Sequence, residues 1–98
     1  MSIQSVAALR ALLVEMEHDV GVYDLSQHQK DILYAAQLLS QTASSISTKS
    51  LQEHSLTKEL PRATFFRNLS TLVDLGYLSH CGTRHQGYTM GGTFPPKD

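Results

Sequence analysis

Histidine and cysteine side chains gather in the second half of the chain, and these residue types could bind a metal or attack a substrate. His80, Cys81 and His85 lie close together in sequence, and His54 precedes them. A structural zinc site needs a closed set of four ligands, and this spacing does not match one. A nucleophilic cysteine needs a base that is oriented by a third group, and no Asp or Glu lies near Cys81 in the hairpin predicted below. The sequence therefore predicts no metal, no cofactor and no enzyme.

Residues 60–77 offer a different chemistry, because they carry basic and hydroxylated side chains at helical spacing. An apolar stripe faces one way and comprises Phe65, Leu69, Leu72 and Val73. The opposite face carries no acid before Asp74. An arginine there could bind guanine through two hydrogen bonds, and a threonine could reach a phosphate or a thymine methyl group. The residues predicted to contact DNA on this helix are Arg62, Ala63, Thr64, Arg67, Ser70 and Thr71. Phe66 lies at the margin of the stripe, and we expect it in the core.

Four further residues are candidates for contact with the phosphate backbone. Lys49 and Lys58 bracket a shorter predicted helix, and Arg84 and His85 lie at the tip of a predicted hairpin. Phosphate contacts fix the orientation of a DNA-binding protein. Exposed lysines and polar hairpin tips are also common on ordinary surfaces, so both interpretations stay open.

Composition limits the class of protein. The 98 residues are enough for one domain, and the formal net charge of −1 argues against indiscriminate binding to nucleic acid. The charge is uneven: residues 1–45 hold two basic and five acidic residues, whereas residues 46–90 hold five basic and three acidic ones. The chain has one cysteine, no apolar run of membrane-spanning length and no signal-peptide pattern, so we expect a cytoplasmic protein with no membrane contact.

The helical and alternating patterns predict the order of the elements. A helix is expected over residues 2–16, followed by a connector over 20–24. A second helix starts at Leu25 with Ser26 as its cap and Gln29 completing a capping box. After a serine-rich loop, Ile46 is expected in a very short strand, and Ser47 caps a helix from Thr48 to about His54. A helix over 60–75 begins with Pro61 in its first turn and ends at Gly76. Strands over 77–80 and 87–90 then form a hairpin.

This order, and several local motifs, resemble a known family of DNA-binding domains. Residues 46–92 are similar to the winged helix-turn-helix domain of IclR-family bacterial transcriptional regulators, and more loosely to MarR-type winged helices. The motifs are Leu60-Pro61-Arg62-Ala63-Thr64-Phe65-Phe66-Arg67, the run Leu69, Leu72, Val73, Gly76 and Tyr77, and Gly87-Tyr88-Thr89-Met90-Gly91. The resemblance implies that the helix over 61–75 enters the major groove and that the hairpin over 77–90 acts as a wing.

The chain also departs from that family. Ala63 stands where the family favours Ser, Asn68 stands where it favours an apolar residue, and the stretch from Leu51 to Pro61 is longer than a usual turn. The family's ligand-sensing domain is absent here, so no small-molecule effector is expected.

The expected fold class is therefore mainly α with a small β-hairpin: a winged helix-turn-helix with an extra N-terminal helix. The expected organisation is an arm over 1–24, the domain over 25–92 and a flexible tail over 93–98. The predicted function is a sequence-specific, double-stranded-DNA-binding transcriptional regulator. A winged-helix module that binds protein rather than DNA is the alternative, and a thiol- or metal-based sensor using Cys81 is a weaker third.

The N-terminal helix has two interpretations. Its apolar face comprises Val6, Leu9, Leu13 and Met16. This face could cover the domain's own core, or it could pack against the same helix of a second copy in a homodimer, as two-fold DNA-binding proteins require. In the dimer we expect Glu15, Glu17 and Asp19 to form an acidic flank away from DNA.

Overall fold

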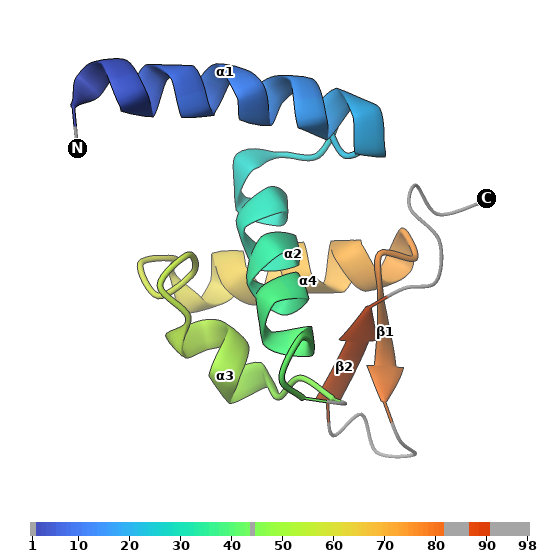
Figure 1. Ribbon diagram of the computed structural model, residues 1–98. Helices are drawn as coiled ribbons and strands as arrows, with labels where there is room; N and C mark the ends of the chain where they lie inside the picture. The colour runs from blue at the N-terminus through green and yellow to red at the C-terminus, as the bar shows by residue number, and fades with distance from the viewer. Residues whose placement is uncertain (1, 44, 82–86, 91–98) are drawn as a thin grey trace.

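The computed structural model describes residues 2–43, 45–81 and 87–90, and this part of the chain contains helices and one small hairpin. In chain order the elements are α1 (Ile3–Val20), α2 (Gln27–Ser40), α3 (Thr48–Glu53), α4 (Arg62–Asp74), β1 (Leu78–Cys81) and β2 (Gly87–Met90) (Figure 1). The predicted fold class, mainly α with a small β-hairpin, is confirmed. The predicted hairpin tip, with Arg84 and His85, and the predicted tail over 93–98 lie outside the described residues.

Serine hydroxyl groups begin three of the helices, as the sequence predicts for two of them. The Ser26 hydroxyl accepts a hydrogen bond from the Gln29 N–H, and the Gln29 side chain accepts one from the Ser26 N–H, which forms the predicted capping box. The Ser47 hydroxyl likewise accepts from the Ser50 N–H. Ser2 caps α1 in the same way. Each cap satisfies a backbone donor that the first helical turn leaves without a partner.

Several helix and strand boundaries in the structure differ by a few residues from the predicted ones. The first helix continues to Val20, beyond the predicted end at residue 16, and stops where Gly21 adopts a φ of 83°. Pro61 precedes α4 rather than forming part of it, since its ψ of 146° is extended. Gly76 ends the α4 region with a φ of 89°, as predicted. The Tyr77 N–H then bonds back to the Leu72 carbonyl, so β1 begins one residue later than expected.

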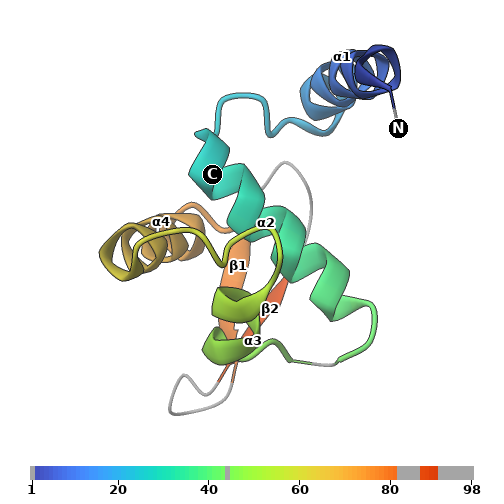
Figure 2. The ribbon, with the colours of Figure 1, turned by 90° about the vertical axis from the view of Figure 1, so that its left-hand side faces the viewer.

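The core forms around α2, which crosses the middle of the molecule in both views (Figures 1 and 2). This helix packs against α3, α4 and β2, while α4 also packs against β1. Leu69 and Leu72 of α4 are buried as predicted. The buried apolar side chains are Val22, Leu25, Ile32, Leu33, Ala35, Ala36, Ile46, Leu51, Phe65, Leu69, Leu72, Tyr77, Leu78 and Tyr88. The core therefore fixes α4 through one face and leaves its other face outside.

The hairpin gains a third backbone partner from the loop before α3. The antiparallel strands pair Leu78 with Met90 and His80 with Tyr88. Ile46 forms an isolated bridge to Tyr88, with N···O distances of 2.8 and 2.7 Å in the two directions. A Cβ atom at Gly87 would lie 3.0 Å from the Ile46 carbonyl oxygen, so this close approach favours glycine. The very short strand predicted at Ile46 is thus present as one bridge.

The first helix, α1, lies apart from the body that the other elements form (Figures 1 and 2). Within the described residues it shares no extensive packing with another helix or strand, and Glu17 is its one buried side chain. The apolar residues Val6, Leu9, Leu13 and Met16 are all exposed, so they do not cover the core of their own chain. The molecule is consequently elongated, with principal extents of 47, 30 and 26 Å.

Glu17, one of the three residues predicted to form an acidic flank on α1, is buried and paired within its own chain. Its side chain is only 3% exposed; it accepts hydrogen bonds from Lys30 at 3.0 Å and from the Tyr34 hydroxyl at 2.5 Å. Burial alone would raise the pKa of Glu17, but the hydrogen bonds from Tyr34 and Lys30 and the charges of Lys30 and Arg10 outweigh it and lower that pKa. This cluster joins the last turn of α1 to α2.

None of the helices in the described part of the chain is both long and apolar enough to cross a membrane.

Candidate nucleic-acid interface

The fourth helix, α4, presents its predicted contact residues on the side opposite the core. Phe65, Leu69 and Leu72 recur at helical spacing and are buried. At 100° per residue, Ala63, Arg67 and Ser70 fall on the other side, and all three are exposed, as is Arg62. Thr64 and Thr71 are half-buried at the edge of this face. Packing of one face therefore positions the other, which is small and basic.

Two polar side chains at the edge of this face are turned back toward the helix. The Thr71 hydroxyl donates to the Arg67 carbonyl at 3.0 Å, and the Asn68 amide donates to the Thr64 carbonyl at 2.8 Å. Asn68 is half-buried, and its amide nitrogen finds an acceptor within the helix itself. Arg67 and Ser70, by contrast, remain exposed. These two, with Ala63, form the centre of the outer face.

Phe66 is exposed, which corrects its predicted place in the core. Its side chain is 36% exposed, because it lies 100° around the helix from the buried Phe65. The two rings meet edge to face with centroids 5.2 Å apart. The Arg62 guanidinium lies over the Phe66 ring, 5.3 Å from its centroid. At an exposed site this cation–π contact contributes about 0.5–1 kcal/mol, and it holds Arg62 along the flank of α4.

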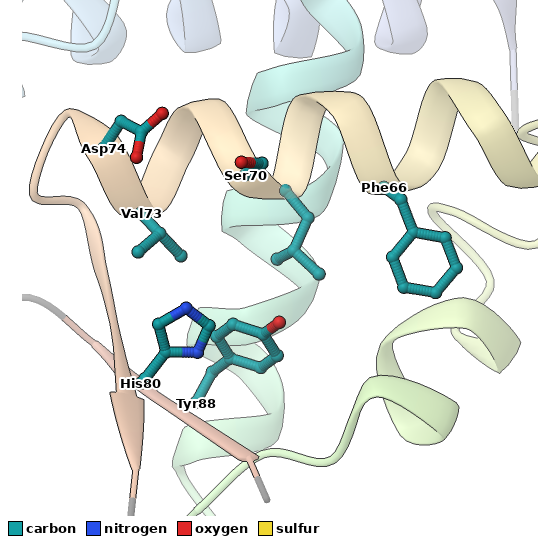
Figure 3. A pocket seen from close by; sticks show the side chains of 7 residues that line it. Phe66, Ser70, Val73, Asp74, His80 and Tyr88 are labelled. Carbon is teal, nitrogen blue, oxygen red and sulfur yellow. The ribbon is translucent and has the colours of Figure 1, made fainter. Parts of the chain in front are cut away.

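A hollow of about 190 Å³ lies between part of α4 and the hairpin (Figure 3). Ser70 and Asp74 lie at the helix edge of this hollow, while the rings of His80 and Tyr88 approach α4 from the hairpin (Figure 3). Those two rings are paired across the strands, with centroids 5.0 Å apart. The full lining is Phe66, Leu69, Ser70, Val73, Asp74, His80 and Tyr88. Sequence reasoning missed this grouping, because only the strand register shows that His80 and Tyr88 are neighbours.

A second hollow, of about 240 Å³, brings Lys58 and Arg62 together at the start of α4. The turn that carries Lys58 is held by the buried Thr57, whose hydroxyl donates to the Leu51 carbonyl at the end of α3. The first turn of α4 contains no acidic residue. Two predicted phosphate contacts therefore share one basic hollow, while Lys49 is exposed on a separate element, α3.

Within residues 2–43, 45–81 and 87–90, no group of three or more His, Cys, Asp or Glu side chains is placed so that it could bind a metal ion. His85, a member of the candidate set in the sequence, lies outside these residues.

No protein-family model, curated protein or solved structure matches the chain. The surface of the chain itself is therefore the basis on which a function can be proposed.

Proposed function

We propose that the chain is a sequence-specific, double-stranded-DNA-binding protein of the winged helix-turn-helix type that regulates transcription. In this proposal α4 lies in the major groove and the β1–β2 hairpin is the wing. The observation that carries it is the outer face of α4, which is exposed, small and basic while the opposite face of the same helix is locked into the core.

The arrangement of elements around α4 supports this assignment. A short helix, α3, and a turn precede α4, and an antiparallel hairpin follows it. Ile46, between α2 and α3, bonds to the second strand of that hairpin. A helix braced in this way can enter a major groove through the side chains of its exposed face. The resemblance of residues 46–92 to IclR-type domains leads to the same assignment of roles.

The available charges suit specific rather than indiscriminate binding. Lys58 and Arg62 share the hollow at the start of α4 and are placed to contact one stretch of phosphate backbone. Arg67 is the long basic side chain near the centre of the outer face and is the candidate for contact with a base edge. With a net charge of −1, the protein cannot rely on a large sequence-independent attraction to phosphate. Base contacts must then supply much of its affinity.

An Arg67→Ala variant tests the proposal. A duplex is first selected from a random-sequence library by the wild-type protein and is then titrated at fixed salt concentration. We expect Arg67→Ala to weaken binding by about 1–3 kcal/mol and to relax discrimination at one base position. Lys58→Ala should instead weaken binding to all duplexes and reduce the salt dependence by about one phosphate contact.

Arg10→Ala is the matched control, because it removes the same charge from the exposed surface of α1. Equal losses for Arg10→Ala and Arg67→Ala would show that only the overall charge matters. A wild-type protein that binds no duplex at low salt would refute the proposed function.

One feature favours a protein-binding module as the second candidate. The hollow beside α4 is lined in part by apolar and aromatic side chains, namely the exposed Phe66, Leu69, Val73 and Tyr88. An aromatic residue at the edge of an apolar hollow is a common feature of protein interfaces. This candidate becomes the better one if the wild-type protein fails the duplex selection.

A further inference from the structure

The exposed face of α1 carries many large apolar side chains for a helix surface in contact with water. Seven large apolar side chains on this helix are between 38% and 83% exposed: Ile3, Val6, Leu9, Leu12, Leu13, Met16 and Val20. Single exposed apolar residues are ordinary, but a continuous row along one helix marks an interaction surface. At 1.5 Å per residue, the 18-residue helix offers a row about 27 Å long.

The spacing of this row makes it complementary to itself. Val6, Leu9, Leu13 and Met16 follow a 3-4-3 pattern, which is the same when it is counted from either end. A second α1 turned by a two-fold rotation places Met16 opposite Val6 and Leu13 opposite Leu9. A two-fold interface requires a patch that complements itself in this way. Glu15 lies about 140° around the helix from the centre of the row and stays outside the contact, whereas Arg10 lies about 80° away, at the margin of the row.

The charge distribution along α1 favours an antiparallel pair. Glu15 and Asp19 lie in the C-terminal third of the helix, and the first turn carries no acid. A parallel pair would place the acidic ends of the two helices side by side. An antiparallel pair places each acidic end beside the positive end of the other helix dipole, which is favourable. Glu17 adds no repulsion, because Lys30 and Tyr34 of its own chain neutralise and bond it.

The apolar surface continues from α1 into the body of the protein. A hollow of about 210 Å³ begins at Val20 and is lined by Val20, Val22, Leu33, Tyr34, Gln37 and Met90. In the antiparallel pair, Ile3 of one copy falls level with Asp19 of the other, one residue before Val20. A stable interface buries about 800 Å² on each partner, which is more than one face of a single helix supplies. The hollow adds apolar surface at the end of the row where the N-terminal turn of the second copy would lie.

We propose that α1 mediates a two-fold dimer, pairing antiparallel with α1 of a second copy of this chain. The apolar row forms the centre of the interface, and the hollow at Val20 receives the partner's N-terminal turn. The dimer goes beyond the proposed function and does not depend on it, since it concerns a surface remote from α4 and requires no DNA.

Sedimentation of the protein without DNA, across micromolar to millimolar concentrations, tests the dimer. We expect a Leu9→Asp, Leu13→Asp variant to raise the dimer dissociation constant more than about a hundredfold while its denaturant midpoint stays near that of the wild type. Ala8→Asp, Ala11→Asp is the matched control, because it adds the same charges to the opposite, exposed face. The control should remain dimeric.

Disulfide cross-linking tests the antiparallel orientation in a Cys81→Ser background, which holds no other cysteine. A Val6→Cys, Met16→Cys variant should form a covalent dimer on oxidation, because the two positions face each other. Val6→Cys alone should not: in the antiparallel pair the two copies of this residue lie about 15 Å apart along the helix, beyond the reach of about 7 Å for a disulfide.

Four outcomes overturn the proposal. A monomeric wild-type protein at the highest concentration excludes the dimer. A folded Leu9→Asp, Leu13→Asp variant that stays dimeric places the interface elsewhere, and one that unfolds as a monomer shows that the row covers its own chain. Efficient cross-linking by Val6→Cys alone refutes the antiparallel orientation.

Discussion

Tyr34→Phe removes one hydroxyl group from the buried cluster that attaches α1 to the body. The Tyr34 hydroxyl donates to Glu17 at 2.5 Å, and Lys30 donates to the other carboxylate oxygen at 3.0 Å. A hydrogen bond to a charged group contributes about 1.5–3 kcal/mol to stability. Tyr34 is half-buried, so we expect a loss near the lower end of that range, about 1.5–2 kcal/mol in the free energy of unfolding. The loss cannot exceed the free energy with which the last turn of α1 docks, because that turn could otherwise swing into water.

A double-mutant cycle with Glu17→Gln isolates the contribution of the hydrogen bond between Tyr34 and Glu17. Stability is measured by urea unfolding at pH 7. If the Tyr34 hydroxyl bonds a carboxylate, Tyr34→Phe should cost at least about 1 kcal/mol less in the Glu17→Gln background, where the acceptor is neutral. Tyr23→Phe is the control. Tyr23 is exposed beside the same cluster, its ring lying 5.5 Å from the Lys30 ammonium, and we expect a change within about 0.5 kcal/mol. Equal costs of Tyr34→Phe in the two backgrounds would refute the reasoning.

The pH dependence of the same cycle follows from the lowered pKa of Glu17. A carboxyl group with a lower pKa in the folded protein stabilises it fully above the ordinary value of 4.5, and this contribution is lost as pH falls through the lowered value. The difference in stability between the wild type and Glu17→Gln should therefore be constant near neutral pH and shrink below 4.5. Burial and the bond to Glu17 raise the pKa of Tyr34, so its hydroxyl remains a donor throughout this window. A difference that grows on acidification would contradict the assignment.

Two further substitutions test the packing that positions α4 and the hairpin. Leu69→Ala should lower the free energy of unfolding by about 2–5 kcal/mol, because Leu69 is buried in the core. Leu75→Ala, at an exposed site, should change it little. Equal denaturant midpoints for the two variants would show that the assigned face of α4 is wrong. Gly87→Ala should cost about 1–3 kcal/mol, since the new Cβ meets the Ile46 carbonyl oxygen at 3.0 Å, and an unchanged thermal midpoint would show that the Ile46 bridge is absent in solution.

Local signals were enough to predict most of the helices. Each helix boundary of this kind depends on residues only a few positions apart, so the local sequence is enough to predict it. Examples are the Ser26 capping box, the Ser47 cap and the left-handed Gly76. The face of α4 that packs into the core was predictable for the same reason, because Leu69 and Leu72 repeat at helical spacing. The candidate contact residues on the opposite face follow from this periodicity.

Features that depend on contacts distant in sequence were not predictable. Glu17 was assigned to the acidic flank of α1, and its burial was not predictable because its partners Lys30 and Tyr34 lie 13 and 17 residues away. Phe66 was expected in the core because it lies at the margin of the apolar stripe; only the packed α4 shows that Phe65 is buried while Phe66 stays exposed. The hollow lined by Tyr88 likewise requires the hairpin register, which the sequence leaves open.

A buried ion pair attaches α1 to the body of the protein, and the geometry of this pair affects how α1 is oriented. A buried ion pair is weak evidence for stability, since an apolar contact of similar volume can be as stable. Its hydrogen bonds are directional, however, and Glu17 accepts from two donors on successive turns of α2. An apolar contact would allow the last turn of α1 to roll or slide, whereas these two bonds to Glu17 favour one orientation of that turn. Since α2 also packs against α4, the last turn of α1 is connected to α4 through one helix. If the chain pairs through α1 and binds DNA through α4, as proposed, this connection sets the spacing of the two outer faces in the dimer.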